Sequence, residues 1–167
     1  LASGEDIHYG TATLAAGAGG RWLTYSVNPA NDTGTIPNPG NAKPNIYNCN
    51  FGGPCGATIP ATGNHHVYSY QPTLTYTADP ASRQYGDPNP AFSGTVAGLV
   101  NGDTAADAYA GTLAFTSPAI PTSGIGSYAI DGSGLTSDVG YAFAQAPGNA
   151  TALTIGQRAL QVTADAG

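Results

Sequence analysis

Leu74-Thr75-Tyr76-Thr77-Ala78-Asp79 alternates apolar and polar side chains, which places Leu74, Tyr76 and Ala78 on one face of an expected strand at 73–78. The stretch returns 86 residues later as Leu160-Gln161-Val162-Thr163-Ala164-Asp165. Self-similarity at a fixed period is typical of tandem repeats. We therefore predict that the second copy opens another module of an array. The alternative is a closing strand that only resembles the first.

Short segments of the same kind, bounded by turn residues, extend outward on both sides of this stretch. Strands are also expected at residues 21–27, 65–70, 92–96, 113–116, 127–130, 141–145 and 152–155. Turns are expected at Asp87-Pro88, Asn101-Gly102, Asp131-Gly132 and Pro147-Gly148. Residues 101–110 favour a short helix, which Asp103 or Thr104 would cap and Gly111 would end.

Composition agrees with an all-β chain. The 167 residues include 24 Gly and 13 Pro, so a helix soon meets a residue that breaks it. We predict tandem small antiparallel β-sandwich modules of the immunoglobulin-like kind, with a β-grasp-like arrangement as the alternative for the second module. Residues 1–72 would form a lead-in β module with a long Pro, Asn and Gly-rich loop. Residues 73–158 would form a repeat module, and 159–167 the first strand of a following repeat.

The charge of the chain excludes two classes of partner. Four basic side chains stand against ten acidic ones, and only 8% of residues are charged. Nucleic acids and anionic membrane surfaces both require clusters of basic side chains, which this chain cannot build. No apolar run approaches the roughly 18 residues of a membrane span, so no membrane insertion is expected. The chain has neither a signal peptide nor a methionine, so we expect a mature or excised piece of a longer protein.

Two cysteines, Cys49 and Cys55, lie in a stretch whose glycines and proline let the chain double back. A local disulfide is feasible there, and it favours an extracellular location. The same cysteines could bind zinc together with His65 and His66, but the spacing differs from that of structural zinc sites. We favour the disulfide with solvent-facing histidines and no metal.

Several motifs of the second half occur in a fixed order. They are Tyr85-Gly86-Asp87-Pro88-Asn89-Pro90, Gly98-Leu99-Val100-Asn101-Gly102-Asp103-Thr104, Gly126-Ser127-Tyr128-Ala129-Ile130, Tyr141 and Leu153-Thr154-Ile155. In these motifs the chain resembles the MBG domain, a tandem module of very large secreted bacterial surface proteins of the filamentous-haemagglutinin type. The resemblance implies a two-partner-secreted adhesin at the cell surface, with neighbouring repeats of the same polypeptide or fibre as partners and no catalytic residues.

The motif residues can also be interpreted from their chemistry alone. Gly86 permits a positive φ, while Pro88 and Pro90 each fix a φ angle and hold Asn89 extended. We therefore expect a rigid corner that needs no contacts. Two tyrosines of the later motifs are expected to bury their rings and leave their hydroxyls at the rim to find partners: Tyr128 and Tyr141.

Acidic residues in loops are the candidates for cation binding. Calcium takes carboxylate and carbonyl oxygens from such loops, and five aspartates are available: Asp87, Asp103, Asp107, Asp131 and Asp138. No loop shows closely spaced acidic residues with a terminal glutamate, so we favour turn-forming aspartates and no cofactor, with calcium as the alternative. Nothing specifies a catalytic carboxylate pair across a cleft, so no enzyme is expected.

Aromatic side chains gather in the Gly- and Asn-rich region of the first 72 residues. They are Tyr25, Tyr47, Phe51, Tyr68 and Tyr70. Aromatic faces beside amide side chains are typical of sugar-binding surfaces, although the same residues could cover a thin core. Asn31-Asp32-Thr33 and Asn149-Ala150-Thr151 also match the glycosylation acceptor pattern.

These observations together predict a non-enzymatic segment of a large bacterial surface fibre. It would act as a stiff spacer that projects or presents adhesive regions. One alternative is a module that binds host or bacterial surface glycans through the aromatic region Tyr25 to Tyr70. The other is a self-assembling fibre subunit, in which the terminal strand at 159–167 completes the sheet of the next copy.

Overall fold

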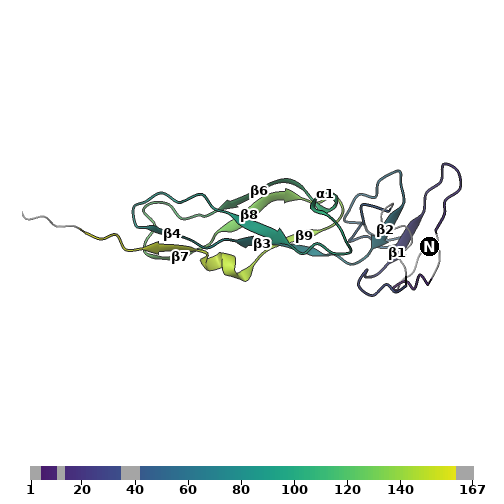
Figure 1. Cartoon of the computed structure of the whole chain (residues 1–167), viewed down its shortest axis with the longest axis horizontal. Coiled ribbons are helices and arrows are strands. Elements are labelled where there is room, and N and C mark those ends of the chain that lie inside the picture. Colours follow the sequence, from purple (N-terminus) through teal and green to yellow (C-terminus); the bar gives the residue numbers. More distant parts are fainter. Residues whose placement is uncertain (1–4, 11–13, 35–41, 161–167) are drawn as a thin grey trace, which may run out of the picture. The chain divides into compact units, whose positions relative to one another are not determined.

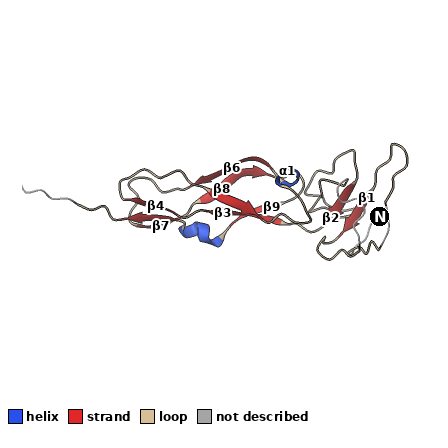
Figure 2. Ribbon diagram, in the orientation of Figure 1, coloured by secondary structure: helices blue, strands red, loops and turns tan. Residues whose placement is uncertain are grey.

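The regular structure is almost entirely strand in this computed structural model, which describes residues 5–10, 14–34 and 42–160 (Figure 1). Figure 2 shows short helical segments, in blue, beside the strands. The elements are β1 (Leu23–Ser26), β2 (His65–Tyr68), β3 (Thr73–Ala78), β4 (Ala81–Gln84), β5 (Gly94–Ala97), α1 (Ala105–Ala108), β6 (Ala110–Thr116), β7 (Gly126–Tyr128), β8 (Asp131–Thr136), β9 (Ala142–Gln145), the 3-10 helix η1 (Pro147–Thr151) and β10 (Leu153–Gly156). The all-β prediction is confirmed.

The strands form four small sheets. Their strand orders are β1-β2, β4-β10-β7, β5-β3-β9 and β6-β8. Strands β7 and β10 pair antiparallel, as do β3 and β5. The pairing is mixed and not antiparallel alone, because β1 pairs with β2 in parallel and β4 pairs with β10 in parallel. Long intervening segments let the chain return in the same direction, as a parallel pair requires.

The described residues group into two compact units, and each unit draws on separated parts of the chain. The first unit takes its residues from Leu1–Leu74, Gly98–Thr112 and Leu135–Ala144. The second unit takes its residues from Thr75–Ala97, Leu113–Gly134 and Gln145–Gly167. The division into modules at 1–72, 73–158 and 159–167 is a division of the sequence, and it stays a prediction.

The second unit has a small core of short side chains. Buried residues from separate strands and loops meet there: Ala78, Ala119, Ile130, Ala152, Leu153 and Ile155. Phe92, Phe115 and Tyr128 are only half-buried and close its edges. The ring of Tyr128 therefore covers the core while its hydroxyl donates to the Gly124 carbonyl at the surface. This arrangement suits a chain with few large apolar residues.

A buried asparagine fixes the segment that precedes β10. Asn149 lies in η1 and is 1% exposed. Its Nδ2 donates to the Tyr76 carbonyl at 3.0 Å, and its Oδ1 accepts from the Ala78 amide at 2.9 Å. Both groups of the side chain are thus used inside the protein, so the acceptor pattern at Asn149 is not available for glycosylation in the folded state. Where the sequence predicts a simple turn at Pro147-Gly148, these contacts support a 3-10 helix.

The turn expected at Asp131-Gly132 is not present, because Asp131 begins β8. Gly132 is needed for packing instead, since a Cβ at this position would lie 2.5 Å from the Cβ of Tyr76. Glycine signals turns and close approaches equally, and the sequence alone does not separate the two. Strand β4 also escaped prediction, since its four residues include two polar side chains and Arg83.

The corner at residues 85–90 is held by side-chain contacts, which corrects the expectation that it needs none. Gly86 does adopt the expected positive φ of 89°. Asn89 accepts from Nε of Arg83 at 2.7 Å and donates to the Ala119 carbonyl at 2.6 Å. Arg83 is itself buried and also donates to the Ile120 carbonyl. The prolines restrict the backbone, but hydrogen bonds hold the corner in place within the second unit.

Two histidines expected to face solvent are buried. His65 and His66 are each 2% exposed, since all four residues of β2 are buried. The ring nitrogens of His65 lie 2.9 Å from the Pro44 carbonyl oxygen and 3.0 Å from that of Thr62. The predicted disulfide between Cys49 and Cys55 is confirmed. The expectation of exposed histidines is wrong because β2 has chain packed against both of its faces.

Candidate functional site

A tight turn at residues 99–104, called here the 99–104 turn, brings one carboxylate into the first unit. Asn101 and Gly102 have positive φ angles of 52° and 67°, and the Asp103 amide donates to the Val100 carbonyl. Thr104 then caps α1 with its side chain, and the Asp107 carboxylate accepts from the Thr104 amide, which is the reciprocal contact of a capping box. The expected turn at Asn101-Gly102 and the expected short helix are both confirmed. The helix ends at Ala108, before Gly111.

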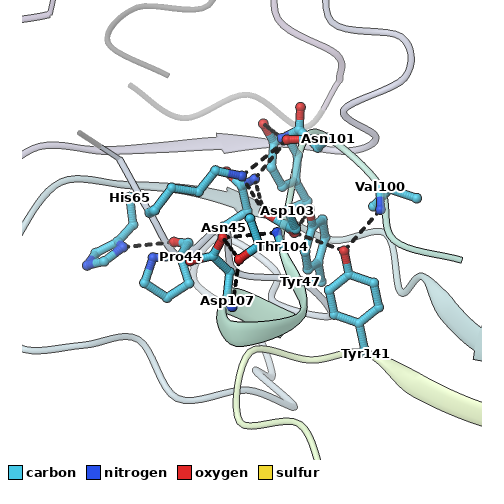
Figure 3. Close-up of polar contacts among 12 residues, drawn as sticks. Pro44, Asn45, Tyr47, His65, Val100, Asn101, Asp103, Thr104, Asp107 and Tyr141 are labelled. Carbon is cyan, nitrogen blue, oxygen red and sulfur yellow. Dashed lines mark hydrogen bonds and ion pairs between the residues drawn. The ribbon is translucent and has the colours of Figure 1, made fainter. Parts of the chain in front are cut away.

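The Asp103 carboxylate accepts hydrogen bonds from four side chains (Figure 3). Its Oδ1 is bonded by Nζ of Lys43 and, at 2.7 Å, by Nδ2 of Asn45. Its Oδ2 accepts from the hydroxyls of Tyr47 at 2.7 Å and Tyr141 at 2.8 Å. These five residues are called the Asp103 network below. Asp103 is 8% exposed, so a negative charge is held inside the protein by one cation and three neutral donors.

Three of these donors come from one short segment. Lys43, Asn45 and Tyr47 all bond Asp103, so their side chains reach the same carboxylate. Ile46, between the last two, is fully buried and bridges to Val67 of β2. The segment therefore serves both the lead-in core and the carboxylate.

Further contacts hold the turn in place around the carboxylate. Nδ2 of Asn101 donates to the Tyr68 hydroxyl at 3.1 Å, and Nζ of Lys43 reaches the Asn101 carbonyl at 3.2 Å. The Val100 amide donates to the Tyr141 hydroxyl. The Tyr47 ring stacks on Tyr68 with centroids 5.5 Å apart and meets Tyr141 edge to face at 5.0 Å. Aromatic packing and hydrogen bonding thus act on the same side chains.

Burial changes the acidity of these tyrosines. It raises the pKa of Tyr141 to about 12, and the nearby Asp103 carboxylate adds to the rise. The pKa values of Tyr47 and Tyr68 are also raised, first by burial and, for Tyr47, next by its hydrogen bond to Asp103. The hydroxyls therefore stay protonated and remain donors at neutral pH. With both carboxylate oxygens already accepting from donors, the network is suited to joining chain segments.

The five aromatic candidates for glycan contact separate into two groups. Tyr47 and Tyr68 are fully buried, as the alternative that these residues cover a thin core requires, so neither can contact a glycan. Tyr70 is 39% exposed and Phe51 is 67% exposed. Tyr25 is half-buried and meets the Phe51 ring edge to face at 5.1 Å. Tyr25 and Phe51 also line a hollow of about 210 Å³ together with Ser26, Asn50 and Ser69.

Three of the five candidate aspartates have separate roles. Asp103 belongs to the network, Asp107 belongs to the helix cap, and Asp87 pairs with Arg158. A backbone hydrogen bond from Thr104 is the largest cause that lowers the pKa of Asp107. Across residues 5–10, 14–34 and 42–160 no three His, Cys, Asp or Glu side chains gather closely enough to hold a metal ion.

The motif residues identified in the sequence occupy different environments. Asp103 and Tyr141 are buried in the network, whereas Tyr85 is 44% exposed. Gly126 has a φ of 151°, at the start of β7. Sequence reasoning missed Lys43 and Asn45, which lie in a loop rich in Pro and Asn. One signal was available: Lys43 is the only lysine of the chain.

Comparison with known proteins finds a family model that matches part of the chain. Residues 74–151 match the family model of the MBG domain, YGX type, a repeat domain of surface adhesin-like proteins. Tyr85-Gly86-Asp87 lies inside the match, as do the 99–104 turn and Tyr141. No curated protein and no solved structure matches the chain. No helix in the described part of the chain is long and apolar enough to cross a membrane.

Proposed function

We propose that this chain is a stiff structural segment of a bacterial surface adhesin, in which the Asp103 network locks the lead-in region to the MBG-like region. The role has no catalytic step and no cofactor. It sits outside the cell, where the Cys49–Cys55 disulfide is stable. Support for a repeat protein of the filamentous-haemagglutinin type, exported by two-partner secretion, comes from the order of the MBG motifs.

The observation that carries this proposal is the origin of the donors around Asp103. Lys43, Asn45 and Tyr47 precede residue 74, where the family match begins, whereas Asp103 and Tyr141 lie within it. A buried carboxylate with four donors tolerates little movement, because displacement leaves charge and hydroxyls unpaired away from water. The joint resists bending for this reason.

The experiment compares the mobility of the two sides of the joint. Backbone ¹⁵N relaxation of the full chain should give residues 43–47 and 99–104 equally high order parameters, near the value of rigid backbone, about 0.85. Asp103→Asn keeps the shape of the side chain but removes its charge and one acceptor oxygen. It should lower the order parameters on both sides, while Asp87→Asn at the exposed pair should not. A joint that is mobile in the wild-type chain would sink the proposal.

A second candidate function is glycan binding, favoured by the exposed Phe51 ring beside Tyr25. The hollow next to them is also lined by Asn50 and Ser69, whose side chains carry an amide and a hydroxyl group. Sugars stack on aromatic faces and hydrogen-bond to such groups. Tyr47 and Tyr68 have no part in this version, because they lie in the core.

Bead attachment separates this candidate from the spacer. The chain is displayed multivalently and tested on a glycan array and on host and bacterial cells. Glycan binding predicts specific attachment that Phe51→Ala abolishes and that Leu113→Ala, at another exposed apolar residue, leaves intact. A well-folded chain that attaches to nothing supports the spacer. The third candidate, strand exchange through 159–167, rests mostly on residues outside the described part, and removal of 159–167 tests it by loss of oligomers.

A further inference from the structure

Two parallel strand pairs, one in each unit, end in similar ways. β1 pairs with β2, and the ladder continues beyond them where the Tyr70 amide donates to the Val27 carbonyl. β4 pairs with β10, and the ladder continues where the Tyr85 amide donates to the Gly156 carbonyl. Each pair is followed by a short linker that contains a glutamine, Gln71 or Gln157, and leads into one copy of the repeated stretch.

In the first unit, the 99–104 turn packs against the end of the β1-β2 pair. The segment after β1 and the linker after β2 line a hollow of about 200 Å³ together with Val100 and Asn101. Asn101 bonds the Tyr68 hydroxyl at the end of β2. Lys43 supplies the cation for Asp103 next to this turn. The end of a parallel pair is thus the surface that receives an MBG turn.

The corresponding end of the β4-β10 pair is an exposed apolar surface. Its hollow of about 520 Å³ is lined by Tyr85, Ile125, Gln157, Arg158, Ala159 and Leu160, and is called here the Tyr85 hollow. Its apolar side chains are 44%, 60% and 93% exposed at Tyr85, Ile125 and Leu160. Contiguous exposed apolar groups of this kind mark interaction sites.

Arg158 gives the Tyr85 hollow a cation. Its side chain is 57% exposed and bonds Asp87 at 2.9 Å through Nη2. A guanidinium has five donors, so one carboxylate leaves several of them for a second. An arriving carboxylate would meet a cation here, as Asp103 meets Lys43.

We propose that the Tyr85 hollow is the docking site for the 99–104 turn of a following MBG module, with Arg158 bonding the carboxylate equivalent to Asp103. This inference rests on the proposed structural function and names its repeating contact. Charge complementarity supports this occupant, as does the use of the same turn against the β1-β2 pair. Each module then receives a turn at one surface and presents a turn from another.

A duplicated chain tests the contact. Residues 1–159 are followed by a second copy of residues 74–158, which preserves the 86-residue spacing of the repeated stretch. Segmental isotope labelling makes only the second copy visible by NMR. We expect amide exchange in its 99–104 turn to be at least tenfold slower than in the same chain carrying Ile125→Glu, which places a charge in the hollow.

A matched variant controls for unspecific effects. Ile120 is 59% exposed but does not line the hollow, so Ile120→Glu should leave the exchange rates unchanged. In the 167-residue chain, both variants should unfold at the wild-type temperature because both side chains are largely exposed. Equal exchange rates in the two variants would overturn the docking proposal. A second copy that remains unfolded would overturn it too, since the hollow should support it.

A double-mutant cycle tests the role of Arg158. Arg158→Gln and, in the second copy, Asp103→Asn should each speed exchange in the second turn, and together they should do little more than either alone. Effects that multiply independently would show that the two side chains do not meet. The Asp103 network of the first copy is intact in both variants. If this cycle shows no coupling, the docking proposal fails but the proposed role of the Asp103 network does not. That role is tested separately by the ¹⁵N relaxation experiment.

Discussion

Two ion pairs of the same chemical kind lie in different surroundings. Lys43 and Asp103 have side chains 24% and 1% exposed, whereas Arg158 and Asp87 are 57% and 37% exposed. The buried carboxylate collects three further donors, and the exposed one is open to water. Burial makes each missing partner costly, while solvent replaces a lost partner at the surface. The surroundings of a turn aspartate therefore decide whether it stabilises the fold.

Removing the two acidic residues should give the largest contrast. Asp103→Ala leaves Lys43, Asn45 and two tyrosine hydroxyls without their shared partner, so we expect a loss of about 3–5 kcal/mol in the free energy of unfolding. Asp87→Ala should lose less than about 1 kcal/mol. Urea unfolding of the full chain measures both. Equal losses of stability would show that burial does not distinguish the two carboxylates.

Alkaline pH should remove the stability that the Asp103 network contributes, and it should leave the exposed Arg158–Asp87 pair unchanged. The pKa of Tyr141 is about 12 in the folded state and close to 10 in the unfolded state. Its contribution is fully present below pH 10 and is lost as the pH rises toward 12, because unfolding then releases a proton. Guanidinium groups in general stay protonated across this range. Urea unfolding at intervals from pH 8 to 12 should show the decline, and Tyr141→Phe should reduce it. A stability that does not change above pH 10 would contradict the network's geometry.

Removing a single hydroxyl should lower the free energy of unfolding less than removing the buried carboxylate, and again more in the buried network than at the surface. Tyr141→Phe loses the bond to Asp103 and the bond from the Val100 amide, for which we expect about 2 kcal/mol. Tyr128→Phe loses a bond to the Gly124 carbonyl at the surface and should cost less than about 0.5 kcal/mol. Thermal unfolding of both variants checks the order. A larger loss from Tyr128→Phe would refute it.

Salt should give the smallest difference. At 1 M ionic strength the screening length is about 3 Å, so the exposed Arg158–Asp87 pair loses its small contribution. The effect of Asp87→Ala should therefore fall to about zero in 1 M sodium chloride, while that of Asp103→Ala persists. Urea titrations at low and high salt measure the change. An Asp103→Ala effect that also vanishes in salt would mean that its carboxylate is solvated.

Local signals predicted much of the fold. Alternation located β3 at its full length and most other strands within a few residues, while Asn101-Gly102 and Thr104 indicated a turn and a capped helix. Each of these signals depends on neighbouring residues only. β4 and β8 were missed, because Arg83 and Gly132 are explained by partners distant in sequence, namely the Ile120 carbonyl and the Tyr76 ring.

The all-β class, the Cys49–Cys55 disulfide, the positive φ at Gly86 and the resemblance of residues 74–151 to the MBG domain could all be predicted from the sequence alone. These follow from composition, spacing and local backbone preference. Only the tertiary structure decided that Asp103 is a buried partner of Lys43 and that Tyr47 belongs to the core. Burial depends on which distant segments pack together, and contacts between residues 56 to 60 positions apart leave no periodic trace in the chain.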